Sequence, residues 1–141
     1  SCMYITWETY QCGNVLSLIV SCGWGFDMNT HSVYLYDTAT GEQMTTAQLL
    51  ETLQVEPETF LAAVRQAAAE RFDGKYAGIG GDTDELVAER RAWTLSDENI
   101  NLDVMTYADA AGNLYVYLPI GSIAGAASYE EPLTLDLGAA G

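Results

Sequence analysis

The sequence contains few basic side chains and no long hydrophobic run. Five lysine and arginine residues stand against 20 aspartate and glutamate residues in a chain of 141, so the formal net charge is −15. This charge repels phosphate backbones and anionic lipids, which makes nucleic acid and a bare membrane poor partners. The longest hydrophobic run, from Val15 to Val20, is interrupted by Ser17 and is far shorter than the roughly 20 residues of a membrane helix. We therefore expect no membrane insertion by this segment.

Basic residues are missing from both ends of the chain. All five lie between positions 65 and 91, where six acidic residues accompany them. Residues 1–64 and residues 92–141 each carry seven acidic residues and no basic one. The two ends are thus strongly anionic and would attract a cationic protein or a metal ion. The same charge also keeps a secreted protein soluble, and the sequence leaves both interpretations open.

Cysteine and histidine are scarce as well. The three cysteines occupy positions 2, 12 and 22; an odd number cannot form a complete disulfide framework, and the spacing matches no zinc motif. If residues 13–14 form a hairpin turn, Cys2 and Cys22 lie several residues out of register. We therefore expect three free thiols. The single histidine, His31, is expected to be a satisfied side chain at a strand end rather than a catalytic base.

Sequence signatures of catalysis are missing. The chain contains no nucleophile elbow, HExxH motif, Walker loop or dinucleotide fingerprint. The many carboxylates would allow a glycan hydrolase, which needs two acids about 5–10 Å apart, but no pair stands in an unusual context. Asp103 and Asp109 are the acids that this alternative would use. We expect a protein that is not an enzyme and that binds no cofactor.

The glycine-rich segment 73–83 does not indicate a ligand site either. It follows a predicted helix and leads into Asp82, Asp84 and Glu85, whose charges would repel phosphate. The same three acids could be considered for calcium, but their spacing does not fit an EF-hand loop. A connection that ends in a capping box from Asp82 to Glu85 explains the segment better, and no metal site is expected.

Alternating hydrophobicity predicts strands at both ends of the chain. In the strand that begins at Val15, hydrophobic residues form one face, and Val15 and Ile19 share the other face with two serines, so we expect both faces to be covered at least in part. The pair Gly13-Asn14 is a strong signal for a two-residue hairpin turn. Six strands are predicted, at 3–11, 15–22, 32–36, 100–108, 114–118 and 133–137.

Helical signals fill the middle of the chain. Thr45 or Thr46 can cap a first helix, and Pro57 stands where the first turn of a second helix tolerates it. A third, short helix is predicted over 83–93. The order βββ-ααα-βββ predicts an α+β domain spanning 1–141, in which two or three helices pack on one face of a single antiparallel sheet drawn from both ends of the chain.

Two connections could carry a binding surface. The segment 23–31 combines glycines with the large side chains Trp24 and Phe26 and ends at His31, and the segment 119–129 is rich in small residues and ends at Tyr129. We take Trp24, Phe26, His31 and Tyr129 as the candidate ligand-binding residues. The alternative is that the two aromatic side chains only cover the end of the core.

Several stretches resemble one family of extracytoplasmic domains. Residues 33–50 read VYLYDTATGEQMTTAQLL, a strand followed by an Asp-x-x-x-Gly-Glu turn and a short helix. Residues 93–99 read WTLSDEN, and a strand that begins at 112 with GNLYVY leads to small residues at 124–126. Over roughly residues 14–137, the chain is similar to the domain of unknown function found at the C-terminus of RsiV-like anti-sigma factors and PdaC-like peptidoglycan deacetylases.

This resemblance implies a location and a role. It implies an extracellular or cell-surface setting in a Gram-positive cell envelope, as part of a larger secreted or membrane-anchored protein. The role that it implies is a non-catalytic binding or sensory module beside a sensor or a wall-modifying enzyme. Some relatives recognise lysozyme, which is a cationic protein, so the resemblance implies a cationic protein or a cell-wall glycan as partner. A wall-active hydrolase or deacetylase-associated domain, and a purely structural spacer, are the alternatives.

Overall fold

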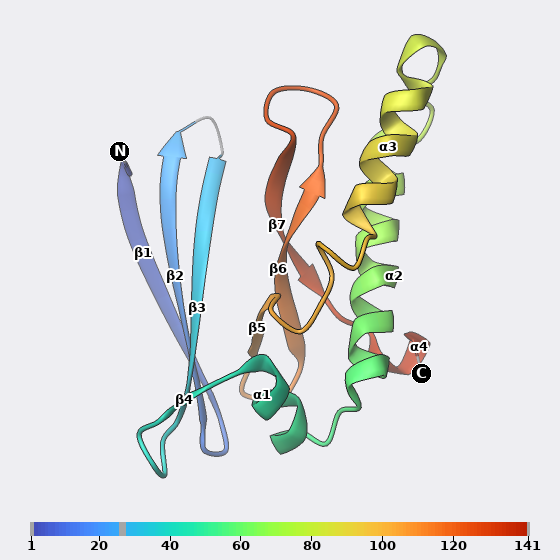
Figure 1. The fold of residues 1–141 in the computed structure, drawn as a ribbon. Coiled ribbons are helices and arrows are strands. Elements are labelled where there is room, and N and C mark those ends of the chain that lie inside the picture. The colour runs from blue at the N-terminus through green and yellow to red at the C-terminus, as the bar shows by residue number, and fades with distance from the viewer. Residues whose placement is uncertain (1, 26–27, 141) are drawn as a thin grey trace.

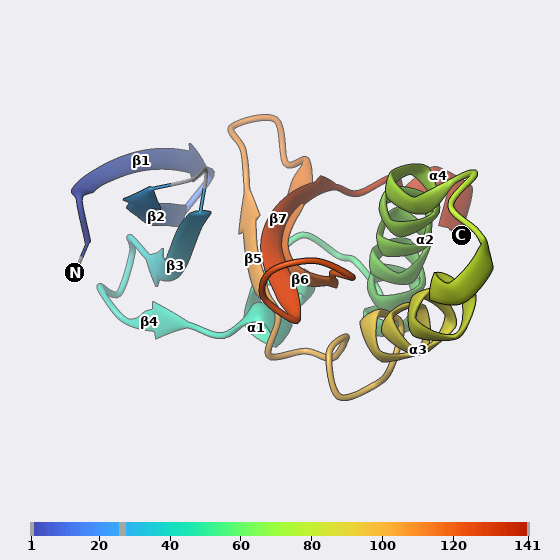
Figure 2. The same cartoon turned by 90° about the horizontal axis from the view of Figure 1, so that it is seen from above.

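Two antiparallel sheets and a layer of helices lie one behind another (Figures 1 and 2). The computed structural model describes residues 2–25 and 28–140. The first sheet has the strand order β1-β2-β3-β4, and the second has the order β5-β6-β7. The long helix α2 and the shorter α3 cover the side of the second sheet that faces away from the first. The second sheet is therefore the middle layer.

The bounds of the elements follow the chain in order. They are β1 (Tyr4–Cys12), β2 (Val15–Gly25), β3 (Met28–Asp37), β4 (Gln43–Met44), α1 (Thr46–Thr52), α2 (Pro57–Tyr76), the 3₁₀ turn η1 (Gly81–Thr83), α3 (Asp84–Thr94), β5 (Met105–Ala108), β6 (Leu114–Gly121), β7 (Ser128–Thr134) and α4 (Leu137–Ala140).

The predicted α+β class is confirmed, and strands, helices and strands succeed one another roughly in the expected order. The prediction of one sheet drawn from both ends of the chain is wrong, because the two ends form separate sheets. The reason lies in β2, whose residues Val15, Ser17 and Ile19 are almost fully buried. This side of β2 packs against the second sheet, and joining the two sheets edge to edge would leave it in water.

Local signals set the first sheet. Gly13 has a φ of +56°, which a two-residue hairpin turn requires and which glycine adopts without strain. The turn pairs Cys12 with Val15 and sets the β1–β2 register, while β2 and β3 pair from Val15 and Asp37 onwards. The strand β3 is longer than the predicted 32–36, and the short β4 was not predicted.

The helices begin at the predicted signals. Thr45 caps α1 with a complete capping box, in which its hydroxyl accepts a bond from the backbone of Gln48 and its own N–H donates to the Gln48 side chain at 2.8 Å. Pro57 opens α2. One side of α2 is buried and packs on the second sheet through residues that recur every four positions, namely Phe60, Val64, Ala68 and Phe72.

Three local predictions are wrong. Helix α2 continues through the expected loop to Tyr76, whose ring packs on Phe72 at 4.7 Å and whose hydroxyl donates to the carbonyl of Gly121. The expected capping box from Asp82 to Glu85 does not form, because a 3₁₀ turn precedes α3 and its N-cap makes no side-chain bond. The predicted last strand 133–137 is displaced, because β7 covers Ser128–Thr134 and the chain enters the short helix α4 at Leu137.

The fourth wrong prediction is the strand at 100–108, of which only Met105–Ala108 is extended. The amide of Asn101 donates to the carbonyls of Asp97 and Glu98, and the backbone N–H of Asp103 donates back to the Asn101 side chain. Side-chain bonds of this kind compete with a strand ladder. They hold residues 100–104 in turns despite the alternating pattern.

Adding one methyl group should have opposite effects on stability at two glycines, because Gly121 lies in the contact between α3 and β6 and Gly74 is exposed. A Cβ at Gly121 would lie 2.8 Å from both the carbonyl oxygen of Arg90 and the hydroxyl of Thr94, so Gly121→Ala should lower the free energy of unfolding by about 1–3 kcal/mol. Gly74 is exposed within α2, and a Cβ there meets nothing within 4 Å. Gly74→Ala should therefore raise the free energy by about 0.5 kcal/mol. Urea unfolding measures both, and equal effects would contradict the close approach at Gly121.

Candidate functional site

Large exposed hydrophobic side chains gather on the first sheet. Eight such side chains are present among the described residues, and seven of them belong to β1–β3 or directly precede β1. Trp7 is 72% exposed and Ile5 is 64% exposed, whereas Ile79 is the single member of this group in the helical part. Scattered exposed hydrophobic residues are normal, but a gathering on one element marks an interaction surface.

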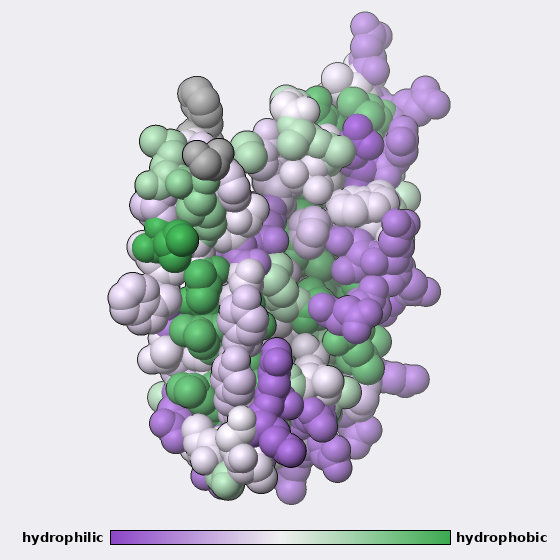
Figure 3. All heavy atoms as spheres, turned by 60° about the vertical axis from the view of Figure 1, so that its left-hand side comes forward, coloured by the Kyte–Doolittle hydropathy of each residue, from purple (hydrophilic) through white to green (hydrophobic). Residues whose placement is uncertain are grey.

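The side of the first sheet that faces away from the second sheet carries three of these side chains, Ile5, Trp7 and Tyr34. We call it the outer face; by strand alternation and register its residues are Ile5, Trp7, Thr9, Gln11, Leu16, Leu18, Val20, Cys22, Thr30, Ser32, Tyr34 and Tyr36. None of them is charged. Figure 3, in which the first sheet comes forward, shows hydrophobic residues along this side and hydrophilic residues toward the helices.

The outer face is hydrophobic because β2 is hydrophobic on both sides. Its inner side is covered by the second sheet, and its outer side, which includes Leu16, Leu18 and Val20, is only partly covered by neighbouring strands. Both faces were expected to be covered at least in part. The structure buries Val15, Ser17 and Ile19 of the face with two serines almost fully, and leaves the face with more hydrophobic residues only partly covered.

A disulfide bond lies at this face. Cys2 and Cys22 are joined, with their Cα atoms 5.8 Å apart, and Cys12 is a free thiol. The expectation of three free thiols is therefore wrong for two of them. The register opposes Ile5 to Cys22 as expected, but the chain bends at Met3 before β1 begins, and the bend returns Cys2 to Cys22. The pairing register of two strands does not predict the path of residues that lie outside the ladder, such as Cys2 and Met3.

Charge is divided between the layers. All five basic residues lie on α2 and α3, and each has a carboxylate within 4 Å. The strongest pair by geometry joins Arg91 and Asp73 through two bonds of 2.8 and 3.0 Å, and this bonding lowers the pKa of Asp73. The described residues of the first sheet and its β3–β4 turn include no lysine or arginine. Their acidic residues are Glu8, Asp37 and Glu42. The outer face thus belongs to a sheet without lysine or arginine in its described part.

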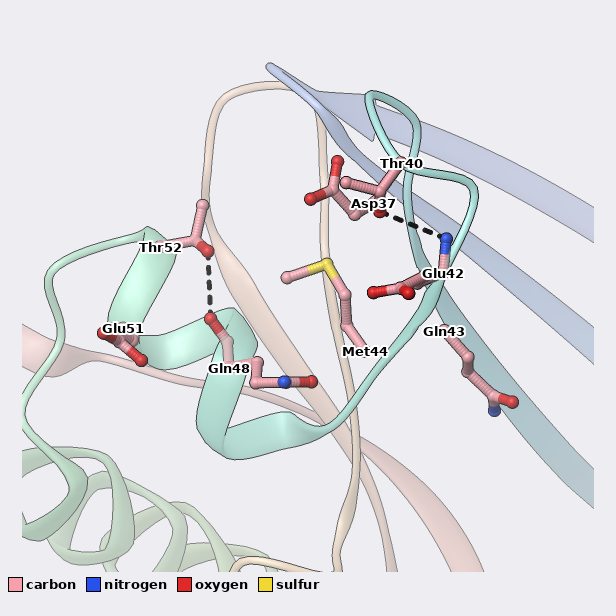
Figure 4. Close-up of a pocket in the computed structure, with 8 residues that line it drawn as sticks. All are labelled: Asp37, Thr40, Glu42, Gln43, Met44, Gln48, Glu51 and Thr52. Carbon is pink, nitrogen blue, oxygen red and sulfur yellow. Dashed lines mark hydrogen bonds between the residues drawn. The ribbon is translucent and has the colours of Figure 1, made fainter.

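An acid-lined pocket lies beside the first sheet, between the β3–β4 turn and α1 (Figure 4). Its volume is about 230 Å³, and the thioether of Met44 points into it. Asp37 and Glu42 border it from the turn, and Glu51 borders it from α1. No group of three acidic, histidine or cysteine side chains that could hold a metal ion occurs in the part of the chain that the structure describes.

The predicted ligand-binding residues do not share one surface. Trp24 lies at the end of β2 and donates from its indole to the Thr30 hydroxyl at 2.9 Å. His31 lies between the sheets, where its Nδ1 is 2.6 Å from Glu130. Tyr129 pairs with Ile120 on the helical side of the second sheet, and its hydroxyl accepts the N–H of Ala126. Phe26 lies outside the described residues.

Of these residues, Trp24 alone adjoins the outer face, and the binding roles stay predictions. His31 of the segment 23–31 stacks on Tyr117, with ring centroids 3.8 Å apart, and pairs with Glu130; both partners flank the segment 119–129 without belonging to it. The sequence analysis did not predict the outer face, because it considered only connecting segments, and not strands, as binding surfaces. The alternation that places Ile5 and Trp7 on the same face of a strand was the sequence signal that could have indicated it.

Tyrosines fill the space between the two sheets. Tyr10 from β1 stacks on Tyr107 at 5.5 Å, and Tyr107 stacks on Tyr115 and Tyr117 from β6. A hydrogen bond to Glu8 at 2.6 Å raises the pKa of Tyr10 to about 12, and burial raises the pKa of Tyr107 and of Tyr117. These phenols therefore stay neutral at pH values where a free tyrosine ionises.

The two acids considered for a hydrolase, Asp103 and Asp109, lie in different surroundings. Asp109 is part of the β5–β6 turn, where it accepts bonds from Ala111, from the backbone and side chain of Asn113, and from the Tyr115 hydroxyl. The bond from the Asn113 side chain is the largest cause of its lowered pKa, and the bond from Tyr115 adds to it. Asp103 is exposed beside residues 98–101. The geometry gives Asp109 a role in the turn.

Comparison with known proteins gives this chain no relative. No protein-family model matches it, and neither a curated protein nor a solved structure is similar to it. Across the described residues, every helix is too short or too polar to cross a membrane.

The tyrosine stack predicts how stability depends on pH. The folded protein keeps the Tyr10 proton up to about pH 12, whereas the unfolded chain releases it near the ordinary tyrosine pKa of about 10. Below pH 10 both states are protonated and stability is unaffected. Between pH 10 and 12 only the unfolded state gains from ionisation, so the free energy of unfolding should fall.

Urea unfolding between pH 9 and 12 measures this fall, and Tyr10→Phe should reduce it. Tyr34→Phe, which removes a hydroxyl from the outer face and leaves the stack intact, is the matched control. Equal pH dependence of the native chain and Tyr10→Phe would contradict the assignment.

Proposed function

We propose that this protein is a non-catalytic extracytoplasmic binding or sensory module of a cell-envelope protein, and that it recognises a cationic protein such as lysozyme. The observation that carries the proposal is the uncharged, hydrophobic outer face on a sheet whose described part has acidic residues and no lysine or arginine. Hydrophobic interface centres with few charges are typical of protein recognition surfaces. The surrounding acids steer a cationic partner toward this face.

The cysteines support an extracytoplasmic setting. Disulfide bonds persist in oxidising compartments and are rare in the cytosol. The pair Cys2–Cys22 holds the start of the chain at the outer face, so an oxidised protein presents this surface in one arrangement. The resemblance of residues 33–50 to extracytoplasmic domains points to the same setting.

Two further features support a cationic partner over a cell-wall glycan. The acid-lined pocket between the β3–β4 turn and α1 offers carboxylates to a lysine or arginine side chain at the edge of the first sheet. The outer face has polar groups only from Thr, Gln, Ser and Tyr residues between its hydrophobic ones. A glycan would need a denser set of polar contacts, so a cationic protein is the preferred partner.

Binding should depend on the two most exposed side chains of the outer face. We expect purified protein to bind lysozyme in calorimetry, more weakly as salt is raised. Trp7→Thr and Ile5→Thr keep the β-propensity of β1 and should each weaken binding by at least about tenfold, because exposed aromatic and aliphatic anchors dominate protein interfaces.

Ile79→Thr is the matched control, because it removes an exposed hydrophobic side chain of similar size from the helical part of the chain. It should leave the affinity unchanged. A flat titration with lysozyme would remove this partner, and a flat titration with peptidoglycan fragments as well would favour a structural spacer. Equal weakening by Ile79→Thr would mean that the outer face is not the site.

A further inference from the structure

The strand β1 has a neighbour on one side only. It stands at the end of the first sheet and pairs with β2 over all of its nine residues (Figure 2). Its residues from Tyr4 to Thr9 are exposed, so both faces of this half of the strand are open as well. A strand of this length is longer than the usual five or six residues. The edge of β1 is therefore an accessible row of backbone groups.

The register tells which backbone groups point outward. Cys12 and Val15 close a two-residue turn, and such a closing pair is hydrogen-bonded. The N–H of Thr38 donates to the carbonyl of Asn14 at 2.8 Å, which directs the even-numbered residues of β2 toward β3 and the odd-numbered ones toward β1. The even-numbered residues of β1 therefore bond to β2. The backbone groups of Ile5, Trp7, Thr9 and Gln11 point away from the sheet.

This edge lacks most of the devices that usually prevent strand addition; the exception is the charged residue Glu8, which lies on the side that faces the second sheet. Natural edge strands carry proline, lysine or a bulge, or are very short. The described strand β1 contains no proline and no lysine, and its pairing with β2 has no irregularity from Tyr4 to Cys12. Glu8 is its single charged residue. An unprotected edge next to a hydrophobic face is the arrangement that binds an extended peptide.

We propose that β1 binds an extended, basic and hydrophobic segment of a partner protein as an added antiparallel strand. The segment would bond to the outward groups of Ile5, Trp7 and Thr9. Alternate residues of an added strand lie beside the same faces as their neighbours. Hydrophobic residues would thus extend the outer face beside Trp7, and lysine or arginine residues would lie beside Glu8. This inference rests on the proposed binding function and names how the partner is held.

Charge makes a second copy of the chain a poor occupant. Antiparallel pairing of two β1 strands through the outward groups places even-numbered residues opposite even-numbered ones. Registers centred on the strand bring the two Glu8 side chains to the same or neighbouring positions, and like charges there are destabilising. Each copy also carries a net charge of −15. A basic segment would instead be attracted both to Glu8 and to the net negative charge of the chain.

A synthetic nine-residue peptide that alternates valine and lysine is the probe. Amide hydrogen exchange with and without peptide should show new protection at Ile5, Trp7, Thr9 and Gln11 and little change at the even-numbered residues of β1. The same peptide with every second amide N-methylated keeps its side chains and charge but loses donors along one edge. Its affinity should be lower by about tenfold or more, because several backbone hydrogen bonds are lost.

Variants of Thr9 test the same point from the side of the protein. Proline is tolerated at an edge position whose N–H faces solvent, so Thr9→Pro should fold and bind the peptide about tenfold more weakly. Thr9→Val changes the side chain and keeps the N–H, so it should bind the peptide clearly more tightly than Thr9→Pro. If Thr9→Pro does not fold, the N-methylated peptide decides the question alone.

Four results would overturn the inference: no peptide binding at millimolar concentration, equal binding of the N-methylated peptide, binding without protection of the four amides, or their protection by rising protein concentration without peptide. The last result would identify a second copy as the occupant. Lysozyme binding that leaves these amides unprotected would be a fifth such result, and it would leave the proposed function standing. Strand addition of the peptide without any lysozyme binding would overturn the proposed partner and leave this inference standing.

Discussion

The packing of β2 against the second sheet is the constraint on which the rest of the structure depends. Ser17 is fully buried there, and its hydroxyl lies 3.4 Å from the backbone N–H of Ala108, while Val15 and Ile19 fill the space on either side. The other face of the second sheet is already covered by α2 and α3. No described element is left to cover the outer face of the first sheet, so the fold itself produces an open hydrophobic surface.

The ion pairs of the helical layer have a consequence far from them. Because α2 and α3 hold all of the basic residues, and each is paired with a carboxylate, the field around the first sheet is set by acids alone. Such a field increases the rate at which a cationic partner arrives and opposes association between copies. Hydrophobic burial would then supply affinity, since exposed ion pairs contribute little.

Some parts of the fold could be predicted because their causes are local. A glycine at a two-residue turn, Thr45 three residues before Gln48, and Pro57 at a first helical turn each act within a few residues. Other predictions failed where a competing interaction won. The side chain of Asn101 replaced a strand ladder by turns, and Tyr76 found a partner in β6 that extended α2 through Gly74. Neither partner is visible in a hydrophobicity pattern.

The sequence by itself determined the class of fold, the N-terminal strands and their turn, the starts of the first two helices and the imbalance of charge, because these depend on neighbouring residues or on composition. Only the tertiary structure decided which side of β2 is buried, that the strands form two sheets, and that Cys2 reaches Cys22. These outcomes depend on contacts between distant residues. The candidate site is among them: alternation placed Ile5 and Trp7 on one face, and the packing of the layers left that face open.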